Sequence, residues 1–419
     1  MKVVVLGAGV IGVTSAYFLA RAGYKVTVIE KNSSVANGCS YGNGGQLSYS
    51  HIETWSSKSS ILSIIKAALT PNSFVKISDF ANQDFWRFAA EFYKNSNPTV
   101  AQENSQKIFA LTSFSKESFA EIIKEEDLSF SFKKGGTLHF YRSLKNFEKA
   151  VKESEKFGPI GCKAQILTAE DCLKKEPALV KLFDEKKLAG GIFYEGDASG
   201  DCAAFTKALA RVCKEKYGVV FEVKTEVKNI LTNFKKITGI NTDKGVFVGD
   251  AYVYCLGAHG VRFLNGINVA SKIYPIKGHS ISIACDQDFI APTQSLTDPE
   301  NKIVYSRLGD NFRVAGTVGF CKANFGVDRA QISFLKKTVC ASFADFGNIN
   351  KIEEWAGFRP FRPNSIPLIC KVKKYGNLFV NSGHGSLGWT MSAGSGKILA
   401  DVVGEKKGQK FKFLDEELA

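Results

Sequence analysis

The sequence predicts an α/β fold: a discontinuous Rossmann-like domain with an inserted α+β domain built on an antiparallel or mixed sheet. Two observations support this prediction. The chain opens with a strand, a glycine turn, a helix and a second strand, which is the order of a βαβ unit that binds dinucleotides. Similar strand, glycine and helix segments recur in the middle and at the end of the chain, so one domain is assembled from separated stretches.

The opening unit comprises a strand at Val3–Leu6, a helix from Val13 to Ala22 and a strand at Lys25–Ile29. Short β-branched apolar runs are typical of buried strands, and Gly23 follows the helix at the position where a left-handed glycine commonly ends one. The turn between the first strand and the helix reads Gly7-Ala8-Gly9-Val10-Ile11-Gly12.

This turn has the GxGxxG pattern, which becomes informative because a strand precedes it and a helix follows it. Gly7 permits the tight turn, Gly9 lets the backbone approach a pyrophosphate, and Gly12 allows the helix to pack closely on the strand. Glu30 ends the second strand, where an acid accepts hydrogen bonds from ribose hydroxyls and repels a 2′-phosphate. The unit therefore predicts a dinucleotide other than NADP, and the alternative is a glycine turn that binds no cofactor.

Two segments after the opening unit have different patterns. Ser33 to Ser50 is rich in Ser, Asn and Gly and lacks apolar periodicity, which predicts a long ordered functional loop. Ser56 to Pro71 has apolar residues at helical spacing, which predicts an amphipathic helix. Such a helix packs on the core, lines a substrate entrance or touches a membrane.

The remaining elements alternate between helical and strand-like patterns. Helices are predicted at Thr112–Glu126, Asn146–Lys156, Asp201–Lys216 and Gln331–Phe343. Strands are predicted at Gly136–Tyr141, Val219–Val223, Asp250–Ala258, Ile273–Cys285, Ile303–Arg307 and Phe312–Ala315. Leu378–Ala400 repeats the order of strand, glycine turn and helix. We therefore assign residues 1–80, 192–262 and 355–419 to the cofactor domain, and residues 81–191 and 263–354 to the substrate domain.

Composition narrows the class of protein. The 419 residues suggest two or three domains, and 44% hydrophobic with 23% charged residues is ordinary for a globular protein. Ten cysteines occur without a CxxC pair, which favours reduced thiols and no metal site. The apolar strand at the start and the lack of a long apolar run lead us to expect neither a secretory signal nor a membrane-spanning helix. The net charge of +14 comes from dispersed lysines without a nucleic-acid-binding signature, so we expect no nucleic acid partner and a weak attraction to anionic membranes.

The order of elements also bears on which dinucleotide binds. An NAD enzyme commonly continues the opening unit with further βα repeats. This chain instead turns at Gly38 into the Ser, Asn and Gly loop and ends with a second glycine motif. That organisation favours FAD.

The chain resembles the FAD-dependent D-amino acid dehydrogenases, within the wider group that contains D-amino acid oxidase and glycine oxidase. The resemblance rests on VVVLGAGVIGVTSAYFLARAGYKVTVIEK, SYGNGGQLS, GDASGDCAAFTKALA, YPIKGHS, GFRP and NSGHGSLGWTMSAGSGKILAD, which together span the chain. It implies that FAD lies across the first βαβ unit. The implied cofactor-binding residues are Gly7, Gly9, Val10, Ile11, Gly12, Glu30, Lys31, Ser40, Asn43, Gly44, Gly45, Gln46, Leu47, Val227, Gly257, His384, Gly385, Ser386, Leu387, Gly388, Trp389 and Thr390.

Each part of that set has a physical role. Paired glycines in the 43–48 segment let backbone amides approach the isoalloxazine ring. Ser40 is expected to contact the phosphates, and the backbone of Val227 to pair with the adenine edge. The 381–390 segment places a helix N-terminus and backbone amides near the flavin pyrimidine, where they stabilise the negative charge of reduced flavin.

The resemblance also implies the substrate ligands. Arg359 lies in the GxRP element, whose arginine binds the substrate carboxylate with two parallel hydrogen bonds. Tyr305 and His279 are the other expected catalytic residues, and Tyr41, Tyr49 and Tyr274 are further candidates for contacts with the substrate. His279 departs from the family pattern, which has a tyrosine there. Arg362 is a second departure, and it either binds a bulkier or more acidic substrate or neutralises Glu353 or Glu354.

The implied reaction is oxidative deamination of a D-amino acid to a 2-oxo acid and ammonia, with hydride transfer to flavin N5. The electrons are expected to pass to a quinone or another respiratory acceptor, in a cytoplasmic protein attached peripherally to the inner membrane. Two alternatives stay open: an oxygen-using amine oxidase for glycine or sarcosine, and a non-catalytic FAD-binding protein. The sequence does not indicate an oligomeric state.

Overall fold

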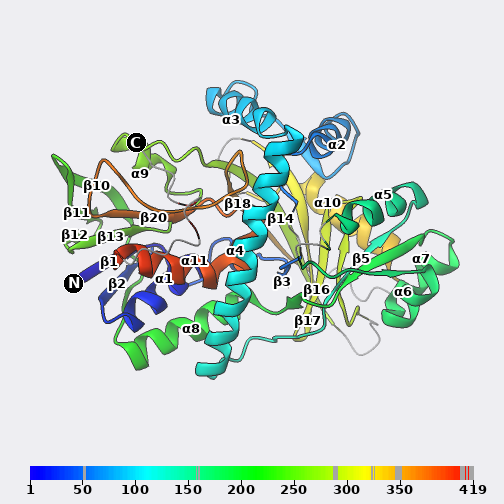
Figure 1. The fold of residues 1–419 in the computed structure, drawn as a ribbon, viewed down its shortest axis with the longest axis horizontal. Coiled ribbons are helices and arrows are strands. Elements are labelled where there is room, and N and C mark those ends of the chain that lie inside the picture. The colour runs from blue at the N-terminus through cyan, green and yellow to red at the C-terminus, as the bar shows by residue number, and fades with distance from the viewer. Residues whose placement is uncertain are drawn as a thin grey trace.

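Two β-sheets lie side by side in the computed structural model, and the long helix α4 (Pro98–Glu125) runs between them (Figure 1). The structure describes residues 1–50, 53–156, 158, 161–285, 291–321, 324, 326–344, 352–405, 411 and 414. No helix in these ranges is long and apolar enough to span a bilayer.

The first sheet draws its strands from the beginning, middle and end of the chain. Its order is β19-β20-β13-β1-β2-β9. These strands are β1 (Lys2–Leu6), β2 (Lys25–Ile29), β9 (Val220–Glu222), β13 (Ala251–Tyr254), β19 (Leu368–Lys371) and β20 (Leu378–Ser382). All neighbours are parallel except β19 and β20. The predicted discontinuous Rossmann-like domain is therefore confirmed.

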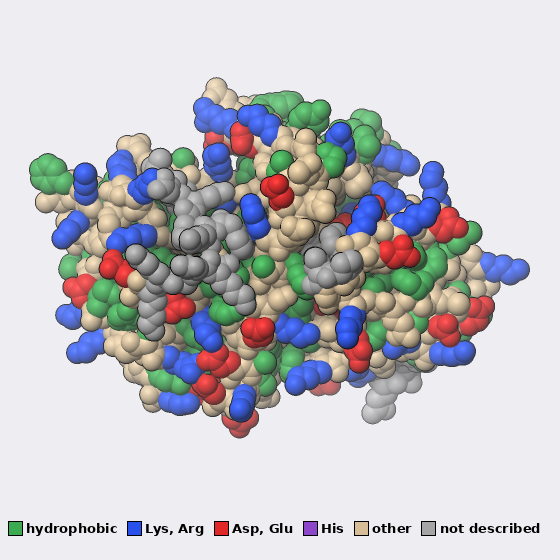
Figure 2. Space-filling model, viewed as in Figure 1, with side chains coloured by type: hydrophobic (Ala, Val, Ile, Leu, Met, Phe, Trp, Pro, Cys, Tyr) green, Lys and Arg blue, Asp and Glu red, His purple; other side chains and the backbone are tan. Residues whose placement is uncertain are grey.

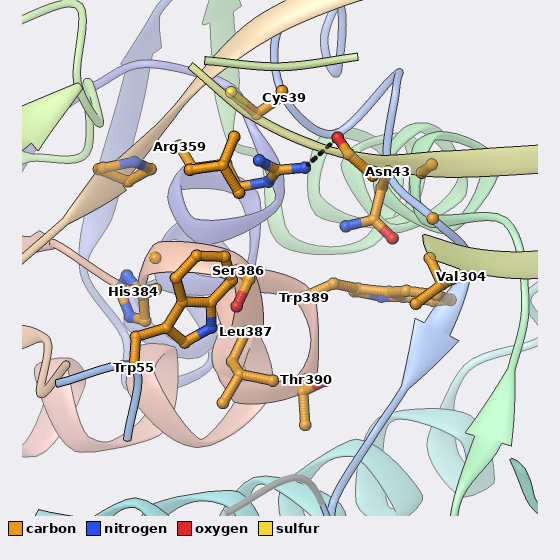
Figure 3. A pocket seen from close by; sticks show the side chains of 18 of the residues that line it. Cys39, Asn43, Trp55, Val304, Arg359, His384, Ser386, Leu387, Trp389 and Thr390 are labelled. Atoms are coloured by element: carbon orange, nitrogen blue, oxygen red, sulfur yellow. Dashed lines mark hydrogen bonds between the residues drawn. The ribbon is translucent and has the colours of Figure 1, made fainter. Parts of the chain in front are cut away.

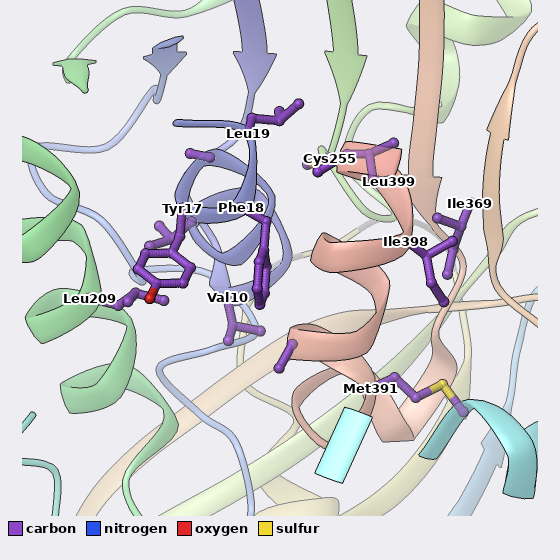
Figure 4. Packing of buried hydrophobic residues seen from close by; sticks show 14 of the residues in the cluster. Val10, Tyr17, Phe18, Leu19, Leu209, Cys255, Ile369, Met391, Ile398 and Leu399 are labelled. Carbon is purple, nitrogen blue, oxygen red and sulfur yellow. The ribbon is translucent and has the colours of Figure 1, made fainter. Parts of the chain in front are cut away.

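Three helices pack together on one face of this sheet: α1 (Val10–Arg21), α8 (Cys202–Tyr217) and α11 (Gly388–Val403). Figure 4 shows Tyr17 of α1 directed toward α8, and Ile398 and Leu399 on α11. A Cβ on Gly396 would lie 2.7 Å from the carbonyl oxygen of Thr14, so α1 and α11 cross with their backbones in contact. This close crossing fixes the N-termini of both helices relative to the sheet.

The opposite face carries a small antiparallel sheet and a short helix. They comprise β10 (Val227–Asn233), β11 (Lys236–Thr242), β12 (Gly245–Phe247) and α9 (Val261–Gly266). Their apolar side chains form a buried cluster with those of β1, β13 and β20. The first sheet is thus covered on both faces, as parallel strands require.

The second sheet is mixed and has the order β18-β14-β17-β16-β15-β5-β7-β6, with β4 paired to β17. Its strands are β4 (Val75–Ile77), β5 (Thr137–Tyr141), β6 (Gln165–Leu167), β7 (Gly190–Tyr194), β14 (Tyr274–Ala284), β15 (Ser295–Asp298), β16 (Ile303–Leu308), β17 (Asn311–Phe320) and β18 (Ile352–Phe361). The pairs β15–β5 and β17–β4 are parallel and the others are antiparallel. This sheet is the predicted antiparallel or mixed sheet.

The other helices are α2 (Lys58–Ala68), α3 (Gln83–Lys94), α5 (Leu144–Glu155), α6 (Ala169–Lys175), α7 (Val180–Asp184) and α10 (Arg329–Ser342). Two short strands, β3 (Gln46–Leu47) and β8 (Ala198–Ser199), pair with each other. The predicted amphipathic helix is α2. Helix α4 begins fourteen residues before its predicted start at Thr112, because the polar run at 102–106 hides the apolar periodicity that reveals the rest of it.

Two predicted domain boundaries fall inside strands. The boundary at 355 divides β18, which pairs along its full length with β14 in the second sheet. The boundary at 192 divides β7, which pairs with β5 and β6 in the same sheet. Helix α4, assigned to the substrate domain, packs on α11 so closely that a Cβ on Gly394 would lie 2.8 Å from Ser115. The two boundaries are misplaced because the sequence of a strand indicates how buried it is but not which sheet it joins.

Candidate active site

A cavity of about 1480 Å³ lies between the two sheets and extends from the glycine turn after β1 to the strands of the second sheet. It is larger than the roughly 300–1,000 Å³ of typical small-ligand pockets. Most of the predicted cofactor residues line it: Gly7, Gly9, Val10, Ile11, Glu30, Lys31, Ser40, Asn43, Gly44, Gln46, Val227, Gly257, His384, Gly385, Ser386, Leu387, Gly388, Trp389 and Thr390. The structure thus brings together residues from three distant parts of the chain.

The glycines of the first turn have distinct packing reasons. Gly7 has a φ of +97°, and a Cβ there would also lie 2.9 Å from the carbonyl oxygen of Cys255. A Cβ on Gly12 would lie 1.9 Å from the carbonyl oxygen of Gly7. Gly9 has only the hydroxyl of Ser40 near its Cβ position, at 3.5 Å. The first and third glycines therefore permit the turn itself, whereas the second keeps the cavity open.

Two polar side chains hold the turn in place. The Glu30 carboxylate is buried and accepts hydrogen bonds from the backbone amides of Ala8 and Asn32, each at 2.9 Å. The Ser40 hydroxyl accepts from the amide of Val10 at 2.9 Å, which satisfies a free donor at the N-terminus of α1. These hydrogen bonds from backbone amides hold both side chains in place at the cavity wall.

The loop over residues 42–47 lies under the second sheet. A Cβ on Gly44 would meet a methyl group of Val304 at 2.4 Å, and one on Gly42 would meet the ring of Trp355 at 2.0 Å. The Gln46 amide donates to Ser295, to the carbonyl of Leu296 and to Thr297. These glycines therefore let the loop pack against β16 and β18.

The structure places three predicted cofactor residues outside the cavity lining. Gly45 has a φ of +81° and packs on Ser306 and Leu308, while Leu47 is fully buried in the core. Gly12 packs on the turn as described. These residues shape the loop and the turn, because alternate residues of a tight segment point away from the cavity that their neighbours face.

The C-terminal glycine motif forms the short helical turn at Gly385–Leu387 and the N-terminus of α11. His384 is buried, and its Nε2 lies 2.8 Å from the hydroxyl of Ser395 on α11. Burial lowers the pKa of His384 to about 3, so the ring is neutral. The Thr390 hydroxyl accepts from the amide of Ser48 at 3.1 Å, which connects this motif to the loop after β3.

Arg359 extends from β18 into the cavity, between Cys39 and Trp55 (Figure 3). Its guanidinium donates to the carbonyl oxygens of Thr317 and Gly316, at 2.9 and 3.0 Å. A Cβ on Gly278 would lie 2.3 Å from the guanidinium carbon, so only glycine on β14 leaves room for this arrangement. Burial lowers the pKa of Arg359 from its usual range, because no carboxylate in the described chain compensates the charge.

A β-bulge presents the two carbonyls to Arg359. The pairing of β14 with β17 shifts register between Lys277 and His279, and Thr317 in the bulge has a φ of +63°. This conformation is unfavourable for a β-branched residue. The Thr317 hydroxyl accepts from the backbone amide of His279 at 3.1 Å, and the His279 Nδ1 lies 2.9 Å from it. The neighbouring strand thereby holds the bulge.

Both ring nitrogens of His279 have hydrogen-bond partners within the protein. The amide of Asp328, the capping residue of α10, donates to His279 Nε2 at 3.2 Å. The accepting Nε2 leaves the proton on Nδ1, which then donates to Thr317. Burial lowers the pKa of His279 to about 4, and the charges of Lys277 and Arg359 act in the same direction. The side chain is neutral and positions the bulge rather than exchanging protons.

The structure does not support the expected catalytic role of Tyr305. This side chain is fully buried on the far face of the second sheet, stacked on Phe312 with ring centroids 6.0 Å apart. Its neighbour Val304 lines the cavity instead, because successive strand residues point to opposite faces. Tyr41, Tyr49 and Tyr274 also lie outside the cavity lining.

Arg362 is buried and donates to the carbonyl oxygen of Ile366 at 2.9 Å, outside the cavity lining. Glu354 pairs with Arg329 and Lys336, and Glu353 bonds to Tyr41. Arg362 therefore stabilises the turn after β18.

Sequence reasoning missed Trp55, Thr317 and Gly278, whose places beside Arg359 depend on contacts between distant segments.

The polar groups that line the cavity fit a dinucleotide. Three buried polar atoms on cavity-lining residues have no hydrogen-bond partner in the described chain: Asn381 Oδ1, Ser382 Oγ and Trp389 Nε1. Buried polar groups are rarely left unpaired, so these atoms fit the polar groups of a ligand. The N-termini of α1 and α11 both reach the cavity, where helix amides stabilise negative charge.

Comparisons with known proteins identify the family of this chain. A family model described as FAD dependent oxidoreductase matches residues 2–402. A D-amino acid dehydrogenase from Azorhizobium caulinodans is 32% identical over 407 residues, covering 97% of each chain. One from Vibrio vulnificus is 30% identical over 403 residues, covering 96% of each chain.

Two solved structures share the fold. The glycine oxidase from Bacillus cereus has a TM-score of 0.74 at 20% identity, covering 100% of this chain and 98% of its own. The L-proline dehydrogenase from P. horikoshii has a TM-score of 0.74 at 18% identity, covering 99% and 96%. The expected resemblance and the expected cofactor are therefore confirmed, and the chain belongs to the family of FAD-dependent oxidoreductases.

Proposed function

We propose that this chain catalyses the FAD-dependent oxidative deamination of D-amino acids to 2-oxo acids and ammonia. The observation that carries the proposal is Arg359, a cation that projects into the cavity with backbone carbonyls as its only hydrogen-bond partners in the described chain. A guanidinium held in this way is organised for a carboxylate. The names of the full-length relatives support a D-amino acid as the substrate.

The cofactor residues have separate proposed roles. Glu30 binds the adenosine ribose, and the Gly7–Gly9 turn with Ser40 binds the pyrophosphate. The backbone of Val227 pairs with the adenine edge. Asn43, Gly44 and the 384–390 segment would hold the isoalloxazine. All of these residues line the same cavity, and bound FAD supplies the acceptor for the hydride of the substrate α-carbon.

The chain itself contributes position rather than proton transfer. Arg359 fixes the substrate carboxylate and so orients the α-hydrogen. The amine enters neutral, so the step does not need a proton acceptor from the neutral His279 or His384 that line the cavity. Loss of the hydride leaves an iminium, which water converts to the 2-oxo acid and ammonia. A hydride transfer of this kind depends on alignment more than on an acid or base.

An anaerobic absorbance titration of the FAD-loaded protein tests the proposal. We expect D-alanine to bleach the bound flavin, and L-alanine to leave it oxidised. Re-oxidation should be slow with oxygen and fast with a quinone analogue. Bleaching by glycine or sarcosine with rapid formation of hydrogen peroxide would instead identify an amine oxidase. A flavin that stays oxidised with every amine would contradict an enzymatic role.

We also propose that the electrons pass to a quinone at the cytoplasmic face of the inner membrane, to which the protein attaches peripherally. The surface of α2 and α3 supports this proposal. Figure 2 shows apolar side chains beside Lys and Arg at the top of the molecule, over these helices. The large exposed apolar side chains of this surface are Leu62, Ile65, Leu69, Phe80, Trp86 and Tyr93.

Charge and position both favour a lipid partner for this surface. The 58–94 segment has five basic and three acidic residues, and one of the acids, Asp79, is buried against Tyr274. Exposed apolar and basic side chains together bind anionic bilayers. On α2, Ser59, Ser63 and Lys66 line the cavity. The helix would therefore bring the cavity close to a membrane-dissolved acceptor.

Replacing Leu62, Ile65 and Leu69 with serine should weaken binding to vesicles that contain anionic phospholipid. Each leucine or isoleucine contributes on the order of 1 kcal/mol when partly inserted, so the triple variant should lose about 100-fold in affinity. Co-sedimentation with vesicles measures this loss. Phe234→Ser is the matched control, because Phe234 is 94% exposed on the β10–β11 turn. Equal binding of the triple variant and the wild type would contradict the membrane surface.

A further inference from the structure

The cavity continues beyond Arg359 across the second sheet. Its floor in this direction consists of Thr317 on β17, Lys302 just before β16, Thr297 on β15, His139 on β5 and Tyr194 on β7. These strands are neighbours in that order. A ligand whose carboxylate is bound at Arg359 can therefore extend along this arm of the cavity.

Lys302 is a cation on this floor, and its backbone contacts β17, the strand whose carbonyl oxygens hold Arg359. A Cβ on Gly316 would lie 2.8 Å from the carbonyl oxygen of Lys302, and the Gly316 carbonyl accepts from Arg359. Lys302, just before β16, therefore lies opposite Gly316 of the adjacent strand β17, and such strands are about 4.8 Å apart. Lys302 has a φ of +55°, which is uncommon for a residue other than glycine and is enriched at functional sites.

The Lys302 side chain faces the cavity without a close partner. It is exposed by surface area although it lies among cavity-lining residues. In the described chain it forms no hydrogen bond or ion pair, and the carboxylate that acts on it most strongly, Glu53, lies beyond ion-pair distance.

The surroundings of Lys302 favour a charged ligand over an apolar one. Lys149 on α5 lines the same arm and adds a second positive charge. Two carboxylates, Glu53 and Asp298, also act on Lys302, and Asp298 is itself paired with Arg142 at 2.8 Å. Glu300, which also lines the arm, is engaged by the amide of Ser143 and the side chain of Asn146. His139 and Tyr194, which complete the floor on β5 and β7, have ring centroids 4.9 Å apart.

We propose that Lys302 binds the side-chain carboxylate of an acidic D-amino acid while Arg359 binds its α-carboxylate. This subsite rests on the proposed function, because it takes Arg359 as the ligand of the α-carboxylate. It makes Lys302 a specificity-determining residue, and D-aspartate and D-glutamate the favoured substrates. The residue acts on binding and leaves the chemical step to the site around Arg359.

Lys302→Met tests the subsite because it keeps much of the side-chain length and removes the charge. We expect kcat/KM for D-glutamate to fall about tenfold or more, as loss of a charge-assisted hydrogen bond predicts. The value for D-alanine should stay within about twofold. The matched control is Lys186→Met, since Lys186 also has a positive φ but is exposed outside the cavity.

A binding measurement gives a readout independent of turnover. Glutarate should bind more tightly than butyrate to the wild type in isothermal titration, and Lys302→Met should abolish the difference. If D-alanine bleaches the flavin but D-aspartate and D-glutamate do not, or if Lys302→Met weakens both substrates equally, the subsite is wrong and the proposed function stands. If no D-amino acid bleaches the flavin, the proposed function and the subsite fail together.

Discussion

Arg359→Ala is expected to lower kcat/KM for D-amino acids by roughly 100-fold or more while the flavin stays bound. A charge-assisted pair to a carboxylate contributes about 3 kcal/mol, and each 1.4 kcal/mol corresponds to a factor of about ten. In the proposed function Arg359 also orients the substrate for hydride loss, so both KM and kcat should suffer. Steady-state kinetics with a quinone analogue, alongside the flavin absorbance per protein, measure the two effects.

Two further variants make this result specific. Arg307→Ala removes an exposed arginine from β16 whose guanidinium donates to Gly309, and it should leave kcat/KM unchanged. Arg359→Lys keeps the charge but not the two parallel donors, so its activity should lie between those of alanine and the wild type. Loss of FAD from Arg359→Ala would assign the arginine to the cofactor instead.

Gly9→Leu is expected to yield folded protein without FAD. Gly9 has a φ of −73°, which any residue adopts, and its Cβ position faces the cavity with only Ser40 nearby. The backbone therefore tolerates the substitution, whereas the added side chain fills the place proposed for the pyrophosphate. The flavin-to-protein absorbance ratio should fall to near zero, with an unchanged far-UV circular dichroism spectrum.

Gly266→Leu is the control for this substitution. Gly266 ends α9, and its Cβ position has no atom within 4 Å, so the variant should keep its FAD. Gly12→Leu would be a poor substitute test because its Cβ would collide with the backbone of Gly7. A yellow holoprotein from Gly9→Leu would show that the pyrophosphate lies elsewhere.

The cofactor half of the site could be predicted because its signals are local. The glycine turn, Glu30 and the 381–390 motif each lie within a few residues of the element that positions them. Tyr305 could not be placed by the same reasoning. Val304 and Tyr305 both look buried in sequence, and which of them faces the cavity depends on the sheets packed on either side of β16.

The substrate half depended on contacts that sequence patterns do not encode. Arg359 was identified through its motif, but the carbonyls that hold it come from a bulge in β17, which forms through pairing with β14. The same pairing explains why β18 belongs to the second sheet. Long-range strand order, rather than local propensity, decides these features.

The two carbonyl oxygens that bind the Arg359 guanidinium also predict an effect of ligands on the stability of the fold. A buried guanidinium compensated only by carbonyl dipoles leaves the empty protein electrostatically unsatisfied. A carboxylate that binds there completes the charge balance, and it binds the native state but not the unfolded chain. At a concentration 100-fold above its Kd, such a ligand adds about 2.7 kcal/mol to the free energy of unfolding. Substrates and inert carboxylates alike should therefore raise the thermal stability of this protein.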